Sequence, residues 1–468
     1  MVERADLPAE KKRWAFVVYL AGDNNLSDEM VWSLQQMKAA SDESSVQDSL
    51  DLVALFDPQG GEPRRYDFSS SGHPADAARD LRSLSIQSLL PPAEAPAQIL
   101  EQLMTGIVRR DRILVLSGHG SGAVGDFLND ENPPSSLSIP ALGRILEGAS
   151  LEILGLDSCQ MSSVEVGYEV RSSVRYLVAS EGPVQNAGWP YRQVLEKIAE
   201  NAASASDGIA RAIADSYLLF YRDYEIAGIS TDIAVSDLSR IGRVAQAVGE
   251  LVRAMEAPLS ALVAGGLEEA FELGELKRGA SEASDESRMV RDAIVLAHWS
   301  AQSYKCDRYT DLHDFVRQLL RFSADRGGPR IGEIRKAGLQ VLEAVEAAVV
   351  SSGATGAELQ HSHGLSIYFP WSFRDFFPEY WNLRFAKDTG WAKFLQTYLR
   401  ATQRMRRFQP AHLKAGVPAA PRKMRETEPG SVETRDVEAG TRKDELGKTC
   451  RSTMKNPPEG YYPPPGQE

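Results

Sequence analysis

Five short runs of apolar residues constrain the fold of this chain more than any other feature of its sequence. The runs are WAFVVYL (14–20), LDLVALF (50–56), ILVLS (113–117), LEILGL (151–156) and YLVAS (176–180). Their apolar residues are nearly continuous instead of alternating with polar ones, which is typical of strands that are covered on both faces. Each run is therefore predicted to be a buried strand of a mainly parallel sheet.

Helical patterns lie between these runs. The first, at residues 27–40, contains Met30, Val31, Leu34 and Met37 at helical spacing, and similar patterns occupy residues 95–110, 138–148 and 161–171. Because strands and helices alternate, the sequence predicts an α/β fold with helices on both faces of the sheet. Further along the chain we expect a sixth strand within 228–238, a long helical stretch over about 237–350 and a late strand at 364–370.

Composition divides the chain into three parts. Residues 1–240 hold the predicted sheet, and residues 241–400 form a helix-rich C-terminal part whose late strand is expected to pack on the core. Residues 401–468 are rich in proline and charges of both signs, with few large aliphatic side chains. Such a segment buries too little apolar surface to offset the entropy lost on ordering, so we predict a disordered tail.

Charge and cysteine content restrict the class of protein. The net charge of −13 argues against nucleic-acid binding, and three cysteines give no disulfide framework, which favours a reducing compartment. The apolar run near the N-terminus is too short for the core of a signal peptide, and no window reaches the length of a membrane span. We expect a cytoplasmic protein that does not bind membranes, with its oligomeric state left open.

Two of the predicted strands end in residues with the chemistry of a catalytic site. His119 follows the strand 113–117 in SGHGSG, and Cys159 follows the strand 151–156 in LDSCQ. Functional residues of parallel sheets gather at the carboxyl ends of the strands. The separation of 40 residues (159 − 119) allows one helix and a return to a parallel strand, so His119 and Cys159 can face one another if the two strands are neighbours.

A thiol and an imidazole at such an edge suit nucleophilic catalysis. The thiolate is the reactive form of cysteine, and a nearby histidine can accept its proton. A helix predicted directly after Cys159 would lower the pKa of the thiol further, and the amide of Gly120 could donate to an oxyanion. The alternative is that Cys159 is a small core residue near a strand end. Spacing alone leaves both interpretations open.

The motifs SGHGSG and LDSCQMSSVEVGYEV resemble the catalytic histidine and cysteine motifs of the clostripain-like cysteine peptidases, relatives of caspases, gingipains and legumains. The segments FVVYLAGDNNL, VASEGPVQNAGWPY, HGLSIYFP and NLRFAKDTGWAKFL resemble other parts of that family in the same order. The resemblance extends from about residue 14 to residue 396. It implies a caspase-like α/β fold and a cysteine endopeptidase that acts on peptides or proteins.

The resemblance also assigns residues. It implies a catalytic dyad of His119 and Cys159 and an oxyanion hole made by the amides of Gly120 and Cys159. Asp157 matches an acid under the primary specificity pocket, which favours cleavage after Arg and less after Lys; its alternative role is a turn or helix cap. The second acid that relatives often carry is missing from GPVQNAGW (182–189), which leaves Glu181, just before it, as the other candidate for substrate binding.

Other functions and cofactors were weighed on the same residues. The rival functions are a catalytically silent binding module and a thiol acyl-transferase, such as a transpeptidase, on the same fold. No organic cofactor is expected, and the acidic loop GDFLNDEN (125–132) leaves calcium open although it lacks EF-hand spacing. His361 and His363 have no third ligand in sight, so no metal site is predicted.

Overall fold

A computed structural model describes residues 14–68, 85–88, 96–106, 112–132, 134–268, 282–304, 307–324 and 326–407. Residues up to Ala401 belong to one compact unit, and a second unit begins at Thr402. The predicted disordered tail lies outside the described residues beyond Arg407, where the last helix ends.

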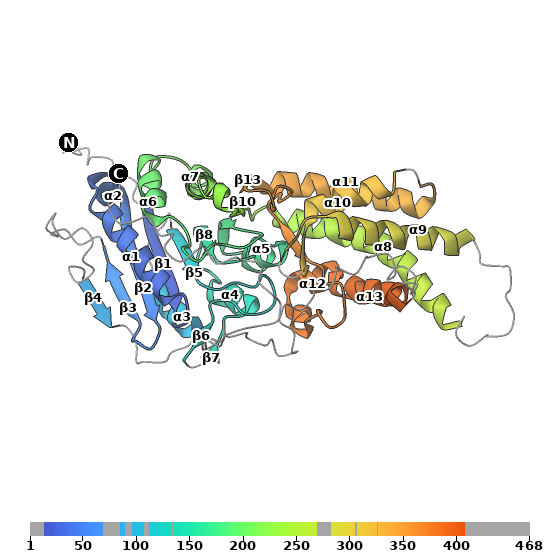
Figure 1. Ribbon diagram of the computed structural model, residues 1–468, viewed down its shortest axis with the longest axis horizontal. Helices are drawn as coiled ribbons and strands as arrows, with labels where there is room; N and C mark the ends of the chain where they lie inside the picture. Colours follow the sequence, from blue (N-terminus) through green and yellow to red (C-terminus); the bar gives the residue numbers. More distant parts are fainter. Residues whose placement is uncertain are drawn as a thin grey trace, which may run out of the picture. The chain divides into compact units, whose positions relative to one another are not determined.

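The core of the described unit is a nine-stranded sheet (Figure 1). Its order is β13-β10-β9-β8-β5-β1-β2-β3-β4, and the five strands from β9 to β2 run parallel. The five apolar runs are thus confirmed as neighbouring parallel strands. The bounds are β1 Trp14–Gly22, β2 Leu50–Pro58, β3 Arg64–Asp67, β4 Ser85–Ser88, β5 Arg112–Ser117, β8 Leu151–Asp157, β9 Val174–Ala179, β10 Thr231–Asp237 and β13 Val349–Thr355.

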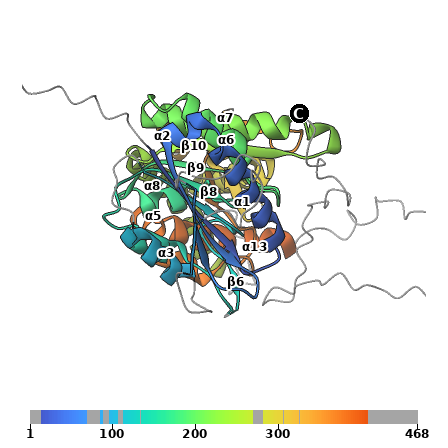
Figure 2. The same cartoon turned by 90° about the vertical axis from the view of Figure 1, so that its left-hand side faces the viewer.

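Helices cover both faces of this sheet, because successive residues of a buried strand point to opposite sides. Phe16 and Val18 of β1 belong to one apolar cluster, and Val17 and Tyr19 belong to the other. Figure 2 shows helices α1 and α3 on opposite sides of the strands. One face carries α1 Ser27–Ser41, α2 Ser44–Ser49, α6 Tyr191–Glu200 and α7 Ser206–Arg222; the other carries α3 Pro96–Gly106, α4 Ile139–Ile145 and α5 Val164–Val170.

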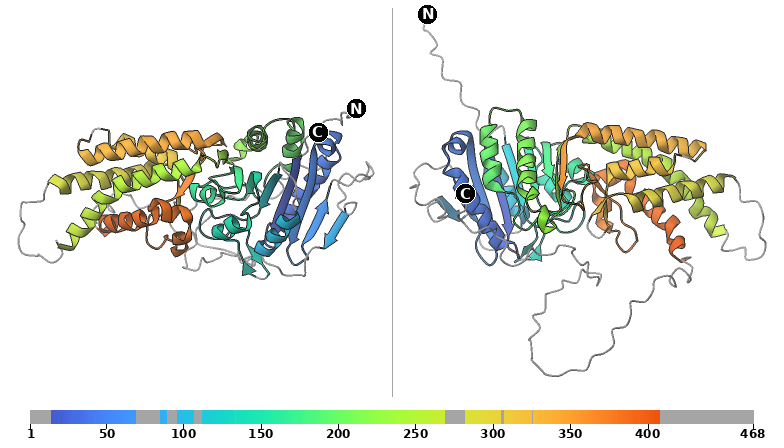
Figure 3. Two further views of the ribbon diagram at one scale, coloured as in Figure 1. Left: turned by 180° about the vertical axis from the view of Figure 1, so that it is seen from behind. Right: turned by 45° about the horizontal axis from the view of Figure 1, so that its top comes forward.

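The helix-rich C-terminal part extends from the β10–β13 edge of the sheet, as the two views of Figure 3 show. Its long helices pack side by side, and short strands form a second sheet of order β11-β12-β14. The bounds are α8 Ile241–Glu268, α9 Glu282–Ser300, β11 Ser303–Tyr304, β12 Tyr309–Asp311, α10 Leu312–Phe322, α11 Pro329–Ala348, β14 Ser366–Tyr368, α12 Arg384–Thr389 and α13 Trp391–Arg407. The remaining short elements are β6 Asp130–Glu131, β7 Pro134–Ser135 and the 3-10 turns Glu225–Ala227 and Pro378–Asn382.

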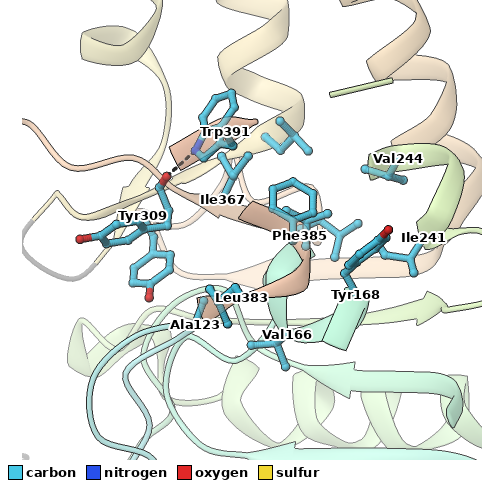
Figure 4. Packing of buried hydrophobic residues seen from close by; sticks show 14 of the residues in the cluster. Ala123, Val166, Tyr168, Ile241, Val244, Tyr309, Ile367, Leu383, Phe385 and Trp391 are labelled. Atoms are coloured by element: carbon cyan, nitrogen blue, oxygen red, sulfur yellow. Dashed lines mark hydrogen bonds between the residues drawn. The ribbon is translucent and has the colours of Figure 1, made fainter. Parts of the chain in front are cut away.

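Apolar side chains join this part to the sheet domain (Figure 4). Val166 and Tyr168 of α5 lie in one buried cluster with Ile241 of α8 and Phe385 of α12. The indole of Trp391 donates a hydrogen bond of 2.8 Å to the carbonyl oxygen of Tyr368 within the same cluster. A shared core of this kind holds the C-terminal part firmly against the helix that follows the cysteine motif.

Several elements differ from the sequence-based expectation. The late strand is shorter than predicted and consists of β14 alone, which belongs to the small sheet. Ser366 of β14 also forms a β-bridge with Ser163, directly before α5. Strands β11 and β12 interrupt the stretch predicted to be helical, and β13 begins at its end. These strands are short or half-exposed, so they produce no apolar run that periodicity could detect.

Candidate active site

The ends of β5 and β8 meet as expected from their spacing. The two strands are parallel neighbours, with Ser117 opposite Asp157, and the amide of Gly118 donates to the carbonyl oxygen of Asp157 at 3.2 Å. His119 and Cys159 each lie two residues beyond this last aligned pair. The sheet therefore delivers the imidazole and the thiol to the same edge.

Gly120 lies directly against the backbone of Cys159. A Cβ atom at position 120 would be 2.4 Å from the carbonyl oxygen and 2.9 Å from the nitrogen of Cys159. No side chain fits at that distance, because heavy atoms of the backbone cannot yield as a flexible side chain can. The glycine next to the histidine is thus required for the two strand ends to approach one another.

The thiol of Cys159 lies against the segment that follows β9. The amide nitrogen of Val184 is 3.4 Å from Sγ, and the carbonyl oxygen of Val184 is 3.6 Å from it. An amide that donates to sulfur favours the thiolate over the thiol. The thiol itself is partly exposed, as a nucleophile must be.

The helix expected directly after Cys159 begins later than predicted. Gln160 adopts a left-handed conformation with a φ of 61°, and α5 starts only at Val164, with Ser163 as its N-cap. The chain turns sharply after the strand instead of entering the helix. Because the helix dipole acts only within the first turn, α5 does not account for activation of this thiol, and the prediction on that point was wrong.

His119 is oriented by Asn25, to which no motif of the sequence assigns a role. Its Nε2 atom lies 2.8 Å from Oδ1 of Asn25, in the loop after β1. Because an amide oxygen only accepts, Nε2 carries the proton in this contact. In the neutral imidazole the lone pair is then on Nδ1, which is the atom able to accept a proton from a thiol. The adjacent asparagines Asn24 and Asn25, directly after the first predicted strand, were the only sequence feature that could have indicated this contact.

His119, Cys159 and Asp157 line one small cavity of about 40 Å³. Its other walls come from α1, from the strand end at Ser117 and from the segment between Val184 and Gly188. Pockets for ligands are usually about 300 Å³ or more. The cavity is therefore closed to an arginine side chain as it stands, and its walls must move apart to admit one.

Asp157 lies at the buried end of this cavity. Its Oδ2 atom accepts hydrogen bonds from the hydroxyls of Ser117 at 2.9 Å and Tyr191 at 2.8 Å, whereas Oδ1 is buried without a hydrogen-bond partner. Burial raises the pKa of Asp157 to about 6, and the two hydroxyls and the nearby Trp189 amide partly oppose that rise. At neutral pH the carboxylate is mostly charged, and Oδ1 can accept a further hydrogen bond once the cavity opens.

A second carboxylate reaches the same cavity from an unexpected direction. Glu29 of α1 is among the lining residues, while its helix neighbour Asp28 is exposed and is not. Residues 182–189, where the family resemblance would place a second acid, contain none. Glu29 lies about 150 residues away along the chain, and only the packing of α1 beside the strand ends brings it near Asp157.

Glu181, the other residue predicted to bind substrate, is not brought to this cavity. Its side chain is fully buried, and Oε2 accepts from the amide of Gly364 at 2.6 Å. Burial and the nearby carboxyls of Asp311 and Asp232 raise its pKa well above the usual range. Asp232 in turn accepts from the amides of Glu181 and Gly182, both at 2.8 Å. These contacts hold Glu181 in the protein interior, so that its role is structural.

The acidic loop at 125–132 contributes to a separate group of carboxylates, which we call the three-carboxyl cluster (Asp23, Asp57 and Asp130). All three side chains are at least nine-tenths buried at the ends of β1 and β2 and in β6. Burial, with repulsion from the other two acids, raises the pKa of Asp57 to about 7. Burial and contact with Asp23 raise the pKa of Asp130 to about 6, against the opposing amide of Asn132.

Comparison with known proteins places the fold in one class, that of caspase-like cysteine peptidases. The model of the clostripain family, Peptidase_C11, matches residues 18–398. The chain therefore belongs to the clostripain family of cysteine peptidases. No curated protein matches the sequence.

Two solved structures share the fold at low sequence identity. One is an inactive zymogen of a C11 protease from Parabacteroides distasonis, which is 18% identical, with a TM-score of 0.55 over 82% of this chain and 99% of that one. The other is a secreted C11 cysteine protease from Bacteroides thetaiotaomicron in complex with an irreversible peptide inhibitor, also 18% identical, with a TM-score of 0.56 over 81% of this chain and 99% of that one.

Proposed function

We propose that this protein is a cysteine endopeptidase that uses Cys159 as nucleophile and His119 as its base. The observation that carries the proposal is the meeting of the two strand ends, where His119 and Cys159 line one cavity and Gly120 touches the Cys159 backbone. Membership of the clostripain family supports the same chemistry. Peptides or proteins are accordingly the proposed substrates, and one structurally similar protease binds a peptide inhibitor.

The proposed reaction follows from this geometry. Nδ1 of His119 accepts the thiol proton, and Sγ of Cys159 attacks the scissile carbonyl carbon to form a tetrahedral intermediate. The amides of Gly120 and Cys159 donate to the oxyanion. The imidazolium then protonates the leaving amine, and water hydrolyses the thioester with His119 again acting as base. Asn25 keeps the ring in the productive tautomer by holding the Nε2 proton.

We propose cleavage after arginine, and less after lysine. An arginine side chain that entered the cavity would meet Asp157 at the buried end of the cavity and Glu29 on the wall that α1 forms. A carboxylate with one unpaired oxygen suits a guanidinium, which carries several donors in a fixed plane, better than it suits a compact ammonium. Oδ1 of Asp157 offers such an atom.

An active-site-directed probe tests the proposed function directly. A peptide that ends in arginine and carries an alkylating group should label the wild-type protein once, on Cys159, as located by mass spectrometry of the digested protein. The same probe should leave Cys159→Ala unlabelled. A wild-type protein that is folded but not labelled would favour the silent binding module instead.

The expected location in the cell stays a prediction. No helix in the part of the chain that the structure describes is both long and apolar enough to span a membrane. The similar protease from Bacteroides thetaiotaomicron is described as secreted, so that likeness lends no support to a cytoplasmic location. The lack of nucleic-acid binding likewise stays a prediction, and the oligomeric state stays open.

The three-carboxyl cluster, to which Asp130 of the acidic loop contributes, is the candidate calcium site that follows from that loop. Calcium prefers oxygen ligands. The three buried carboxylates supply oxygen atoms, and a dication would relieve the repulsion among them that helps to raise the pKa values of Asp57 and Asp130. The hydroxyl of Tyr19, fully buried and without a hydrogen-bond partner, faces the same three acids. We therefore propose this cluster as the site at which calcium should be tested.

Replacing Asp57 by asparagine tests both the buried charge and the cation. The folded-state pKa of Asp57, about 7, exceeds the ordinary value of 3.8. The folded chain therefore binds more protons than the unfolded chain between these pH values, and stability falls as pH rises through 7. In chelator, Asp57→Asn should raise Tm at pH 8 by about 2 °C and have little effect near pH 4.

Calcium should reverse the order of the two proteins at pH 8. Binding to the folded state should stabilise the wild type and leave Asp57→Asn almost unchanged in differential scanning calorimetry. Asp28→Asn, which changes an exposed acid of α1, is the control and should behave as wild type. An equal calcium response in wild type and Asp57→Asn would move any calcium site elsewhere.

A further inference from the structure

The fold supplies the third ligand that the HSH motif lacked in the sequence. Asp311, His313 and His363 come from the end of β12, the first turn of α10 and the loop before β14, and each offers a ligand atom within 4.8 Å of those of the other two. Strands β12 and β14 pair antiparallel, with Asp311 opposite Ser366. This pairing places His363, three residues before Ser366, beside the start of α10. His361 is exposed and is not part of the group.

We propose that Asp311, His313 and His363 bind a divalent transition-metal ion, with zinc as the expected ion. Two imidazoles and one carboxylate are ligands that zinc accepts at about 2.0–2.2 Å. Tetrahedral coordination requires ligand atoms about 3.3 Å apart, so small side-chain rotations would bring the group to the metal. Three protein ligands leave the fourth position for water.

Outer hydrogen bonds already orient both imidazoles for this role. His363 donates from Nδ1 to the carbonyl oxygen of His361 at 2.7 Å, which leaves the lone pair on Nε2. His313 places Nε2 3.2 Å from the carboxylate of Glu346, and its Nδ1 is buried without a hydrogen-bond partner. Metal-binding histidines typically have the second nitrogen held in this way by a carbonyl or a carboxylate.

The two rings and the carboxylate are also held together as a unit. The ring centroids of His313 and His363 are 4.4 Å apart, with 28° between their planes. Asp311 is fully buried, and its two oxygens accept from the amides of Asp314 and His363, both at 2.6 Å. Oδ1 of Asp311 also lies 3.3 Å from Nδ1 of His363, a contact that a bound metal ion would replace. Stacked imidazoles repel one another when both are protonated, whereas both can bind one cation in their neutral forms.

Charge around the group favours a cation. The carboxyls of Glu181 and Asp232 are buried beside Asp311. Three buried acids next to one another are costly without compensating positive charge, and a dication supplies more of it than one histidine can. Gln160, next to the nucleophile, donates its amide to the carbonyl oxygen of Gly182 at 2.9 Å. A bound ion would thus stabilise the structure behind the cavity.

Zinc titration of Cys159→Ala, full-length and metal-free, tests this proposal without interference from the reactive thiol. Calcium in excess should occupy sites made only of oxygen atoms. Isothermal titration calorimetry should then show one zinc ion per chain. His313→Ala and His363→Ala, each made in the same background, should weaken binding at least about tenfold, and the matched control His361→Ala should bind as the parent does.

X-ray absorption at the zinc edge gives a second test that needs no ligand variant. The spectrum should show nitrogen and oxygen scatterers, with the multiple scattering of two imidazoles and no sulfur. Sulfur in the spectrum would assign the ion to Cys306 or Cys450 and overturn the proposal. The proposal would fail equally if the parent protein bound no zinc, or if His313→Ala and His363→Ala bound zinc as tightly as His361→Ala.

Discussion

Cys159→Ala should lower kcat for peptide hydrolysis by about 10⁴-fold or more, and His119→Ala should lower it nearly as far. The thiol and the imidazole act as one unit, so the double variant should be little worse than Cys159→Ala alone. Neither side chain belongs to the fully buried core, and the unfolding transitions of both variants should stay close to that of wild type. The measurement is kcat with an arginine peptide, together with calorimetry of each variant.

Two further variants define what these losses mean. His361→Ala removes an exposed imidazole that touches neither the cavity nor the dyad, and it should keep full activity. Asn25→Ala should lower kcat about tenfold and shift the pH profile, because its contact with Nε2 of His119 fixes the tautomer. Full activity in Cys159→Ala would refute the assignment of the nucleophile, and an unchanged pH profile in Asn25→Ala would refute the orienting role.

Asp157→Asn should lower kcat/KM for arginine peptides by about 100-fold and for neutral peptides by much less, because it removes the buried partner of the substrate's cation. Asparagine fits the site: its carbonyl oxygen can accept from Ser117 and Tyr191, and its NH₂ group replaces Oδ1, which has no partner. The substitution therefore isolates the charge. Profiling with a peptide library measures the effect, and Glu29→Gln should cause a smaller loss in the same direction, with Asp28→Asn as its control.

The pH dependence of specificity gives an independent check. Burial raises the pKa of Asp157 to about 6, so its carboxylate is charged above that pH and neutral below it. The ratio of kcat/KM for arginine peptides to that for neutral peptides should fall as pH is lowered through 6. Titration of the dyad cancels in this ratio. A ratio that falls equally in Asp157→Asn, or a preference for acidic or apolar residues, would show that Asp157 is only a structural acid.

The sequence by itself determined the framework of the candidate site. Continuous apolar runs can be buried only in strands covered on both faces, so the parallel core could be predicted from them. The carboxyl ends of parallel strands share one edge of the sheet, and the two motifs follow predicted strands that come one after the other along the chain. That local rule brought His119 and Cys159 together, and the glycine at position 120 marked the close approach of their backbones.

Only the tertiary structure decided which distant polar residues surround that framework. Glu29 lines the cavity and Asn25 contacts His119 because α1 and the loop after β1 lie near the end of β5, whereas Glu181 is buried against Asp311 instead. The proposed zinc ligands combine residues about 50 positions apart. Periodicity reports which face of an element is apolar, but it carries no information on which other element covers that face. The burial and the partners of a polar side chain depend on that choice, and so they emerge only when the whole chain is packed.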